Sequence, residues 1–316
     1  MPGFVRRAVL GGLAGTAAGI AGLGLGTRAS AEAVKWSSGT EPARTPAPPD
    51  ATDCHHHVYD GRFPIAPSAT LKPGDATVAD YRALQKRIGT SRHVVVQPST
   101  YGTDNRLLVE ALGQFGPEAR GVAVVDTNVT DAELKALHAA GVRGIRFNLV
   151  QSGATTVDMI EPLSKRVEPL GWHVQIHMLG DGIVQIKDLL ARLPSQIVFD
   201  HLGRIPEPAG ANHPAFAVIR GLLDKGRTWM KLSGAYIDTK AGPPGYADTS
   251  ALARAFAAAN PERVVWGSDW PHPTEPGTKP DDAVLFDLLA QWVPDQTART
   301  RVLVRNPAEL YGFGRM

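Results

Sequence analysis

The sequence predicts a single (β/α)8 barrel, the TIM-barrel fold, over residues 51–316. Eight short segments rich in valine and isoleucine recur along this region, and segments with helical patterns separate them. The strand segments are apolar on both faces, which is typical of parallel strands covered by helices. A doubly wound open sheet usually has fewer strands, and no G-x-G-x-x-G motif follows the first strand here. The barrel is therefore the favoured fold.

The expected strands and helices alternate in a regular order. The strands are residues 51–58, 93–97, 121–126, 143–148, 172–178, 196–201, 228–233 and 263–269. Two of the intervening helices have clear ends. Residues 131–141 begin at an aspartate and end at a glycine, and residues 251–260 end at an asparagine that precedes a proline.

The N-terminal residues 1–31 resemble a secretory signal peptide. Arg6 and Arg7 precede an uncharged segment rich in alanine, glycine and leucine, and an A-x-A motif ends the region. Adjacent arginines resemble the twin-arginine type, so we expect export by that machinery to the periplasm or the exterior, with a retained membrane anchor as the alternative. Residues 32–50 are rich in proline, serine and threonine and are expected to be a short linker.

Composition limits the classes of function. The chain has 316 residues, of which 43% are hydrophobic and 20% charged, with a formal net charge of +2. These values are typical of a soluble globular protein with a sizeable core, and no basic run predicts nucleic-acid binding. Cys54 is the only cysteine, so an internal disulfide and a multi-cysteine zinc site are excluded. Nothing in the sequence predicts the oligomeric state.

Polar side chains end almost every expected strand. In a (β/α)8 barrel the C-terminal ends of the strands meet at one mouth, where the active site is built. The strand-end residues are His55 and His57, Gln97 and Ser99, Asp126, Arg146 and Asn148, His177, Asp200 and His201, Lys231 and Ser233, and Asp269. We therefore expect a polar active site at this mouth.

The triple histidine of the first strand divides into two faces. His55 and His57 are two residues apart, so their side chains project from the same face, and His56 should point outward toward the helices. A His-x-His pair on an inward face is a common way to hold a divalent metal. Cys54 is expected to face the barrel wall as a small apolar residue. A Cys54–His55 nucleophile is not expected, because neighbours on a strand point in opposite directions.

The strand-end motifs together resemble the amidohydrolase superfamily. In order along the domain they are DCHHHVYD, VVVQPSTYGTDN, GVRGIRFN, VQIHM, VFDHLGR, WMKLSGAY, VVWGSDWPH and NPAELYGF. The resemblance is strongest to the branch typified by 2-pyrone-4,6-dicarboxylate lactonase. It implies a barrel with H-x-H on strand 1, a histidine on strand 5 or 6 and an aspartate on strand 8. It also implies hydrolysis of a lactone or a related carbonyl compound.

The same resemblance implies roles for four residues. Asp269 would be the general base that takes a proton from water and later passes it to the leaving alkoxide. His55, His57 and His177 would either bind one divalent metal, zinc or manganese, together with Asp269, or donate hydrogen bonds to the carbonyl. The strand-4 lysine of two-metal members is missing, because this strand reads RGIRFN. One metal ion or none is therefore expected, and a two-metal centre is not.

Arginines near the strand ends predict a small anionic substrate. Arg146 ends the fourth strand, Arg204 follows the sixth and Arg106 follows the second. Guanidinium groups bind carboxylates through two parallel hydrogen bonds. The other expected substrate-binding residues are Ser99, Tyr101, Thr103 and His201.

Three functions remain open at this point. The first is a hydrolase that opens a polycarboxylate or sugar-acid lactone. The second is a metal-dependent decarboxylase of the same superfamily, which uses similar positions and would release carbon dioxide. The third is an exported barrel that binds organic acids without turnover. The third needs only the arginines, so the presence of Asp269 with three strand-end histidines favours an enzyme.

Overall fold

The computed structural model describes residues 1–4, 33–151 and 153–314. Residues 5–31, which make up nearly all of the predicted signal peptide, lie outside the described residues. Within the described ranges, no helix is both long enough and apolar enough to cross a membrane. From residue 33 onward the chain belongs to one compact unit.

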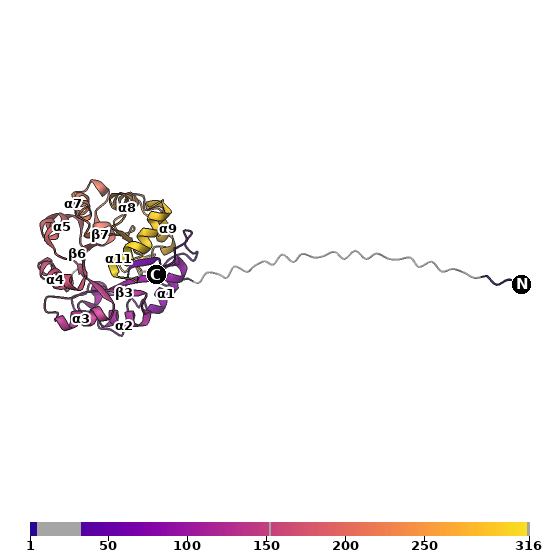
Figure 1. Cartoon of the computed structure of the whole chain (residues 1–316), viewed down its shortest axis with the longest axis horizontal. Helices are drawn as coiled ribbons and strands as arrows, with labels where there is room; N and C mark the ends of the chain where they lie inside the picture. Colours follow the sequence, from indigo (N-terminus) through magenta and orange to yellow (C-terminus); the bar gives the residue numbers. More distant parts are fainter. Residues whose placement is uncertain (5–32, 152, 315–316) are drawn as a thin grey trace. The chain divides into compact units, whose positions relative to one another are not determined.

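Eight parallel strands form a closed ring surrounded by helices (Figure 1). Each strand pairs with the next along the chain, and the main chain around His56 pairs with Trp270 to close the ring. The predicted (β/α)8 barrel is confirmed. The strands are β1 Thr52–His56, β2 Arg92–Val96, β3 Ala119–Ala123, β4 Val142–Asn148, β5 His173–His177, β6 Gln196–Phe199, β7 Thr228–Leu232 and β8 Val264–Trp266.

The last strand is shorter than the expected 263–269. Asp269 has a φ of 63°, which lies in the left-handed region, so the extended backbone of β8 ends before it. The turn lifts the Asp269 side chain out of the strand's alternation and leaves it beside β1. This local departure from strand geometry matters for the site described below.

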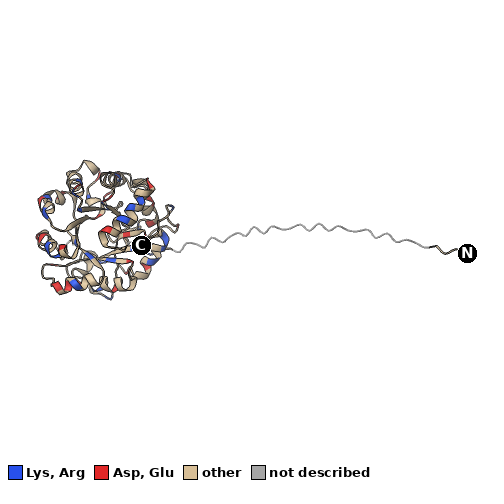
Figure 2. Cartoon of the chain, viewed as in Figure 1, with Lys and Arg blue, Asp and Glu red and all other residues tan. Residues whose placement is uncertain are grey.

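Helices cover the outside of the ring and one end of it. They are α1 Val78–Ile88, α2 Arg106–Phe115, α3 Asp131–Ala139, α4 Ile160–Val167, α5 Gly180–Gln185, α6 Lys187–Arg192, α7 Pro214–Leu223, α8 Ala247–Ala259, α9 Asp282–Trp292, α10 Gln296–Thr300 and α11 Asn306–Tyr311. Capping boxes fix the start of two of them: Thr77 with Asp80 at α1, and Thr130 with Glu133 at α3. Lysines and arginines are interspersed with aspartates and glutamates around the barrel (Figure 2).

A register shift in β1 changes the expected position of Cys54. The pairing of β1 with β2 is irregular between Asp53 and His56, as at a β-bulge. Cys54 packs in a cluster with Val94 and Val96 of β2 and with residues of α11, inside the ring. The prediction that it faces the wall is therefore wrong, although it is buried among apolar residues as expected.

His56 points outward, as predicted. Its ring stacks on Tyr81 of α1 at a centroid distance of 3.4 Å, and its Nε2 lies 2.8 Å from Nδ1 of His93. This face of β1 therefore belongs to the packing between the ring and the helices.

Residues 33–50, for which a linker is predicted, have no helix or strand but lie against the barrel. The Trp270 indole donates a hydrogen bond of 2.8 Å to the Lys35 carbonyl. The buried Arg87 of α1 donates to the carbonyls of Ser38 and Glu41, each at 2.9 Å, and pairs with Asp281 at 2.6 Å. This segment is thus fastened to α1 and to the start of α9.

We predict that Arg87→Met lowers the free energy of unfolding by about 2–3 kcal/mol, because the partly buried carbonyls and the Asp281 carboxylate lose the donor that the buried guanidinium supplies. Urea denaturation followed by tryptophan fluorescence measures the change. Lys86→Met is the matched control, since Lys86 lies on the same helix but is exposed. Equal effects of the two substitutions would contradict the anchoring role of Arg87.

Candidate active site

The C-terminal ends of the strands surround a cavity at the mouth of the barrel. His55 lies buried beneath it, within 3.5 Å of Asp269. The predicted site residues that line the cavity are His57, Ser99, Arg146, His177, His201, Arg204 and Asp269, and they are joined there by Tyr59, Asn148, Gln151 and Thr274. The structure therefore brings most of the predicted site together at the expected end of the barrel.

One carboxylate oxygen of Asp269 is fixed by a hydrogen bond, and the other faces side chains of the cavity. Its Oδ2 accepts a hydrogen bond of 2.6 Å from the Tyr236 hydroxyl. Its Oδ1 lies 3.5 Å from Nε2 of His55, 3.5 Å from Nε2 of His57 and 3.6 Å from Nε2 of His201. These distances exceed those of good hydrogen bonds, so Oδ1 can still accept a proton or a ligand.

Asp269 is ionised at neutral pH. Burial by itself would raise the pKa of Asp269, but the imidazoles of His201, His57 and His55 outweigh burial and hold this pKa well below its ordinary value. A buried carboxylate that stays ionised and keeps one oxygen free is suited to accept a proton.

Two further residues extend the hydrogen bond between Asp269 and Tyr236 into a chain. Nδ1 of His272 lies 3.0 Å from the Tyr236 hydroxyl, and its Nε2 lies 3.1 Å from both carboxylate oxygens of Asp282. Since the single Tyr236 proton goes to Asp269, the histidine donates to the tyrosine oxygen. This buried chain from Asp282 orients Asp269, and sequence analysis did not identify it.

A second buried chain fixes the protons of the histidine pair. Lys231 Nζ lies 3.1 Å from His55 Nδ1, His55 Nε2 lies 3.3 Å from His57 Nε2, and His57 Nδ1 lies 2.7 Å from the Val96 carbonyl. An ammonium only donates and a carbonyl only accepts. For neutral imidazoles these contacts run in one direction: Lys231 donates to His55, His55 to His57, and His57 to Val96.

This chain leaves His55 neutral, with its proton on Nε2. Burial, reinforced by the nearby Lys231, lowers the pKa of His55 well below its ordinary value. Burial also lowers the pKa of Lys231, to about 8, although Asp200 opposes the shift.

Asp200 lies at the centre of the charged layer beneath the mouth. Its Oδ2 accepts hydrogen bonds from Arg146 Nε at 2.9 Å and from Gln175 Nε2 at 3.1 Å. Burial would raise the pKa of Asp200, but His55, Arg146 and Lys231 hold it well below its ordinary value. Asp200 and Lys231 were recognised only as strand-end residues. Gln175 was missed, although its place two residues before His177 puts both on the inward face of β5.

His177 lies at the mouth as predicted, but it contacts arginines. Its Nδ1 is 3.1 Å from Asn148 Oδ1 and 3.2 Å from Arg146, and its Nε2 is 2.9 Å from Arg204. Arg204 also pairs with Asp238 through two hydrogen bonds of 2.8 and 3.1 Å. A guanidinium cannot accept, and a neutral imidazole has one lone pair, so only one of the two arginines can donate to His177. The shorter contact is that of Arg204 with Nε2, which leaves Nδ1 to donate to Asn148. In this arrangement His177 has no nitrogen free for a metal.

Other side chains of the mouth have the spacing of metal ligands. The ligand atoms of His55, His57 and Asp269 all lie within 4.8 Å of one another, as do those of His55, Asp200 and His201. The separations of 3.3 to 3.5 Å within the first group are close to the edge of about 3.4 Å expected for a tetrahedral ion with bonds of about 2.1 Å. These buried groups could therefore hold a metal ion.

The fit depends on where His55 carries its proton. A metal ligand must turn a lone pair toward the ion, and His55 Nε2 has none while Lys231 donates to Nδ1. The set of ligands fits an ion only when the proton of His55 lies on Nδ1, which is 3.2 Å from Asp200 Oδ1.

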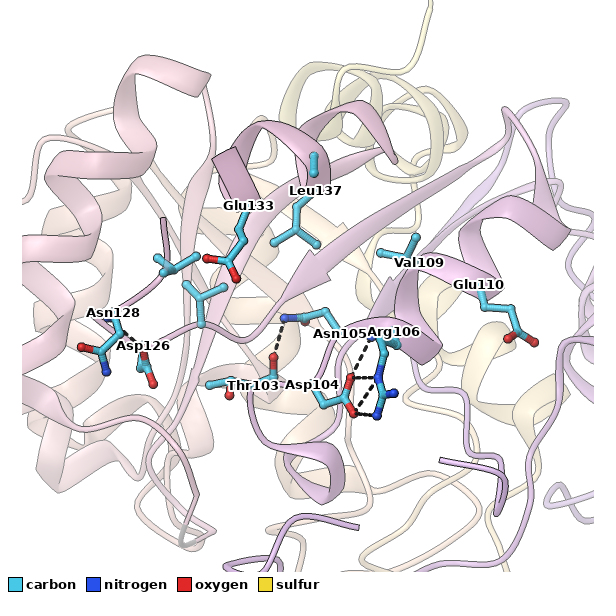
Figure 3. A pocket seen from close by; sticks show the side chains of 13 residues that line it. Thr103, Asp104, Asn105, Arg106, Val109, Glu110, Asp126, Asn128, Glu133 and Leu137 are labelled. Carbon is cyan, nitrogen blue, oxygen red and sulfur yellow. Dashed lines mark hydrogen bonds and ion pairs between the residues drawn. The ribbon is translucent and has the colours of Figure 1, made fainter. Parts of the chain in front are cut away.

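Three predicted substrate-binding residues do not line the cavity. The Tyr101 hydroxyl accepts from the main chain of Asp60 at 2.9 Å, and Arg106 pairs with Asp104 at 2.6 Å on the surface. Thr103 and Arg106 line a separate groove between α2 and α3 (Figure 3). After Ser99 a short turn carries the chain outward into α2, so the residues that follow leave the mouth.

Comparison with known proteins agrees with this site. The model of the amidohydrolase family matches residues 52–313, which is most of the chain. The chain belongs to the amidohydrolase family. The resemblance recognised in the strand-end motifs is thereby confirmed.

Three curated relatives of this amidohydrolase are similar over nearly their whole length. A 2-pyrone-4,6-dicarboxylate hydrolase of Comamonas testosteroni is 35% identical, over 87% of this chain and 94% of its own. A 4-sulfomuconolactone hydrolase of Rhizobium radiobacter is 35% identical, over 84% and 91%. A D-galactarolactone isomerase of Agrobacterium fabrum is 33% identical, over 89% and 97%. These three relatives are thus two lactone hydrolases and a lactone isomerase.

The different positions of the arginines give a testable contrast. We predict that Arg204→Gln weakens binding of a carboxylate-bearing ligand about tenfold or more, because the variant loses a cation at the cavity and the donor to His177. Arg106→Gln, the control, should change the dissociation constant by less than about twofold, since Arg106 is exposed and paired outside the cavity. Isothermal titration calorimetry with sugar-acid lactones and their hydroxy acids measures both. A larger effect of Arg106 would refute the assignment.

Proposed function

We propose that this amidohydrolase opens the ring of a lactone by hydrolysis, with Asp269 as the general base. The observation that carries the proposal is the ionised Asp269, whose Oδ2 is held by Tyr236 while Oδ1 faces the cavity among imidazoles. The activities of the two hydrolase relatives support the same reaction class.

In the proposed reaction, Asp269 Oδ1 takes a proton from a water molecule, whose oxygen attacks the carbonyl carbon of the lactone. Cationic donors at the cavity, above all Arg204 and Arg146, stabilise the negative oxygen that develops. The ring C–O bond then breaks, and protonated Asp269 returns its proton to the leaving alkoxide. One water is consumed and one hydroxy acid is formed. A divalent ion, when bound by His55, His57 and Asp269, would supply polarisation of the carbonyl.

The charges at the mouth favour a substrate with few carboxylates. Arg146 is paired with Asp200 and Arg204 with Asp238, so much of the positive charge of both guanidiniums is already balanced. The cavity wall is otherwise rich in neutral polar groups that suit hydroxyls, namely Ser99, Asn148, Gln151 and Thr274. Between the two predicted substrate classes, we therefore propose a sugar-acid lactone over a polycarboxylate lactone.

Isomerisation of a lactone is the second candidate, because an isomerase relative is 33% identical over 89% of this chain. The same carboxylate would then take a proton from a hydroxyl of the substrate in place of water. The two reactions differ in their products, since hydrolysis releases acid and a ring shift does not.

We predict that sugar-acid lactones yield acid in a pH-indicator assay with the purified protein, and that Asp269→Asn lowers kcat about 10³-fold by removing the base. Calorimetry should give a dissociation constant for the hydroxy-acid product within about threefold of the wild-type value, because the arginines remain. Acid release by the variant at the wild-type rate would exclude Asp269 as the base. A ring shift without acid would identify an isomerase, and carbon dioxide release a decarboxylase.

We predict that Tyr236→Phe lowers kcat/KM at neutral pH about tenfold and moves the acidic limb of the pH–rate profile to higher pH. The hydroxyl donates to the ionised carboxylate, so its removal raises the pKa of Asp269, and the base becomes protonated at a less acidic pH. Tyr101→Phe is the control, because that hydroxyl contacts Asp60 outside the cavity. An unchanged profile for Tyr236→Phe would argue against the positioning role.

A further inference from the structure

We propose that Lys231 decides whether the histidine pair of the mouth can hold a divalent cation, by keeping His55 in the tautomer that cannot bind one. Lys231 is thus a positioning residue that acts through His55. The inference concerns the occupancy of the site and does not depend on which lactone is the substrate.

The surroundings of Lys231 suit an ammonium with three donors. The side chain is fully buried on β7, and its Nζ lies 2.8 Å from Gln175 Oε1, 3.1 Å from His55 Nδ1 and 3.6 Å from Asp200 Oδ1. The orientation of the Gln175 amide is fixed, because its Nε2 donates to the other oxygen of Asp200. Two donors of Lys231 therefore face acceptors at hydrogen-bonding distance, and its charge lies near the carboxylate of Asp200.

This arrangement uses the lone pairs that a metal would need. With Lys231 donating to Nδ1, the neutral His55 carries its proton on Nε2 and turns it toward His57 Nε2, 3.3 Å away. A neutral His57 accepts there, because its Nδ1 donates to the Val96 carbonyl. Nε2 of His55 thus carries a proton, and the lone pair on Nε2 of His57 accepts it as a hydrogen bond. Neither nitrogen therefore directs a lone pair at a cation.

A second arrangement of the same residues would free both nitrogens. His55 Nδ1 lies 3.2 Å from Asp200 Oδ1, and within the described part of the chain this buried oxygen has no hydrogen-bond partner. If His55 carried its proton on Nδ1, it could turn it to this oxygen. The Nε2 lone pairs of His55 and His57 would then both face the region of Asp269 Oδ1. The unpartnered oxygen of Asp200 thus provides the acceptor that the metal-binding tautomer requires.

The two arrangements exclude each other at Lys231. In the second one, the N–H groups of Lys231 would face the N–H of His55 at a separation of 3.1 Å, with two donors opposed. A divalent cation beside His55 would also repel the buried ammonium, and such repulsion is strong where water is excluded. Lys231 therefore favours the cation-free arrangement, and its removal should favour the cation-binding one.

The test is Zn²⁺ binding to the full chain and to two variants. Lys231→Met removes the ammonium and keeps an unbranched side chain, and Gln175→Met disturbs the same buried layer but keeps the ammonium. Competition with a chromophoric chelator gives the affinity, and metal analysis after dialysis gives the stoichiometry. We expect one Zn²⁺ per chain in Lys231→Met, bound about tenfold or more tightly than by the wild type or by Gln175→Met. Adding His55→Ala to Lys231→Met should abolish this binding.

Two results of the zinc measurements would overturn the proposal. One is Zn²⁺ binding by the wild type as tight as by Lys231→Met. The other is an equal gain in Gln175→Met, which would trace the effect to loosened packing.

If Lys231→Met fails to fold, as judged by circular dichroism, the wild type still provides a test. Its His55 signals in ¹⁵N NMR, assigned against the His55→Gln variant, should show a protonated Nε2 and an unprotonated Nδ1. A protonated Nδ1 would overturn the proposal.

Discussion

Two main-chain hydrogen bonds close the barrel between β1 and the chain that follows β8, and the site depends on this seam. The Asp269 N–H donates to the His55 carbonyl at 2.8 Å, and the His57 N–H donates to the Trp270 carbonyl at 2.9 Å. The closure that completes the sheet therefore also sets Asp269 beside both histidines. A Cβ on Gly267 would lie 2.7 Å from that of His55, so this close approach requires glycine. Asp53 fastens the seam further, since its buried carboxylate accepts from both the N–H and the hydroxyl of Ser268.

Beneath the seam the barrel buries a layer of charged side chains. Burial of apolar side chains there would cost less free energy. Arg146, Asp200 and Lys231 are almost fully inaccessible to solvent, and desolvation of buried ions often exceeds their mutual attraction. Their hydrogen bonds define which nitrogen of His55 carries a proton and how the guanidinium of Arg146 is turned. The layer therefore contributes to the site through orientation more than to stability, and replacement by packed apolar residues would lose that control.

Alternation along the strands was sufficient to predict the barrel, its mouth and the inward direction of His55 and His57. Alternation assumes an unbroken pleat, so it failed at Cys54, where β1 shifts register against β2. Arg106 was placed at the mouth only because it follows the second strand, and that prediction failed because the chain has already turned away into α2. The contact of Tyr236 with His272 could not be predicted, since these residues are 36 positions apart on loops without a periodic pattern. Sequence periodicity predicts which way the side chains of a strand point. The path of a loop depends on tertiary packing, which no local sequence pattern predicts.

The relatives of this chain include hydrolases and an isomerase. A physical reason for these two reactions in one family is that the supports of Asp269 differ from the side chains that would contact the substrate. Asp269 is oriented by the main-chain seam and by the hydroxyl of Tyr236. Other groups would meet the substrate, and Arg204 in particular is positioned by Asp238 and His177. A change at the rim can therefore alter whether water or a substrate hydroxyl lies against Asp269 while the base itself stays in place. On the proposed mechanism, the choice between ring opening and ring shift would rest on residues such as Arg204, Asn148 and Ser99, and Asp269 would accept the proton in both reactions.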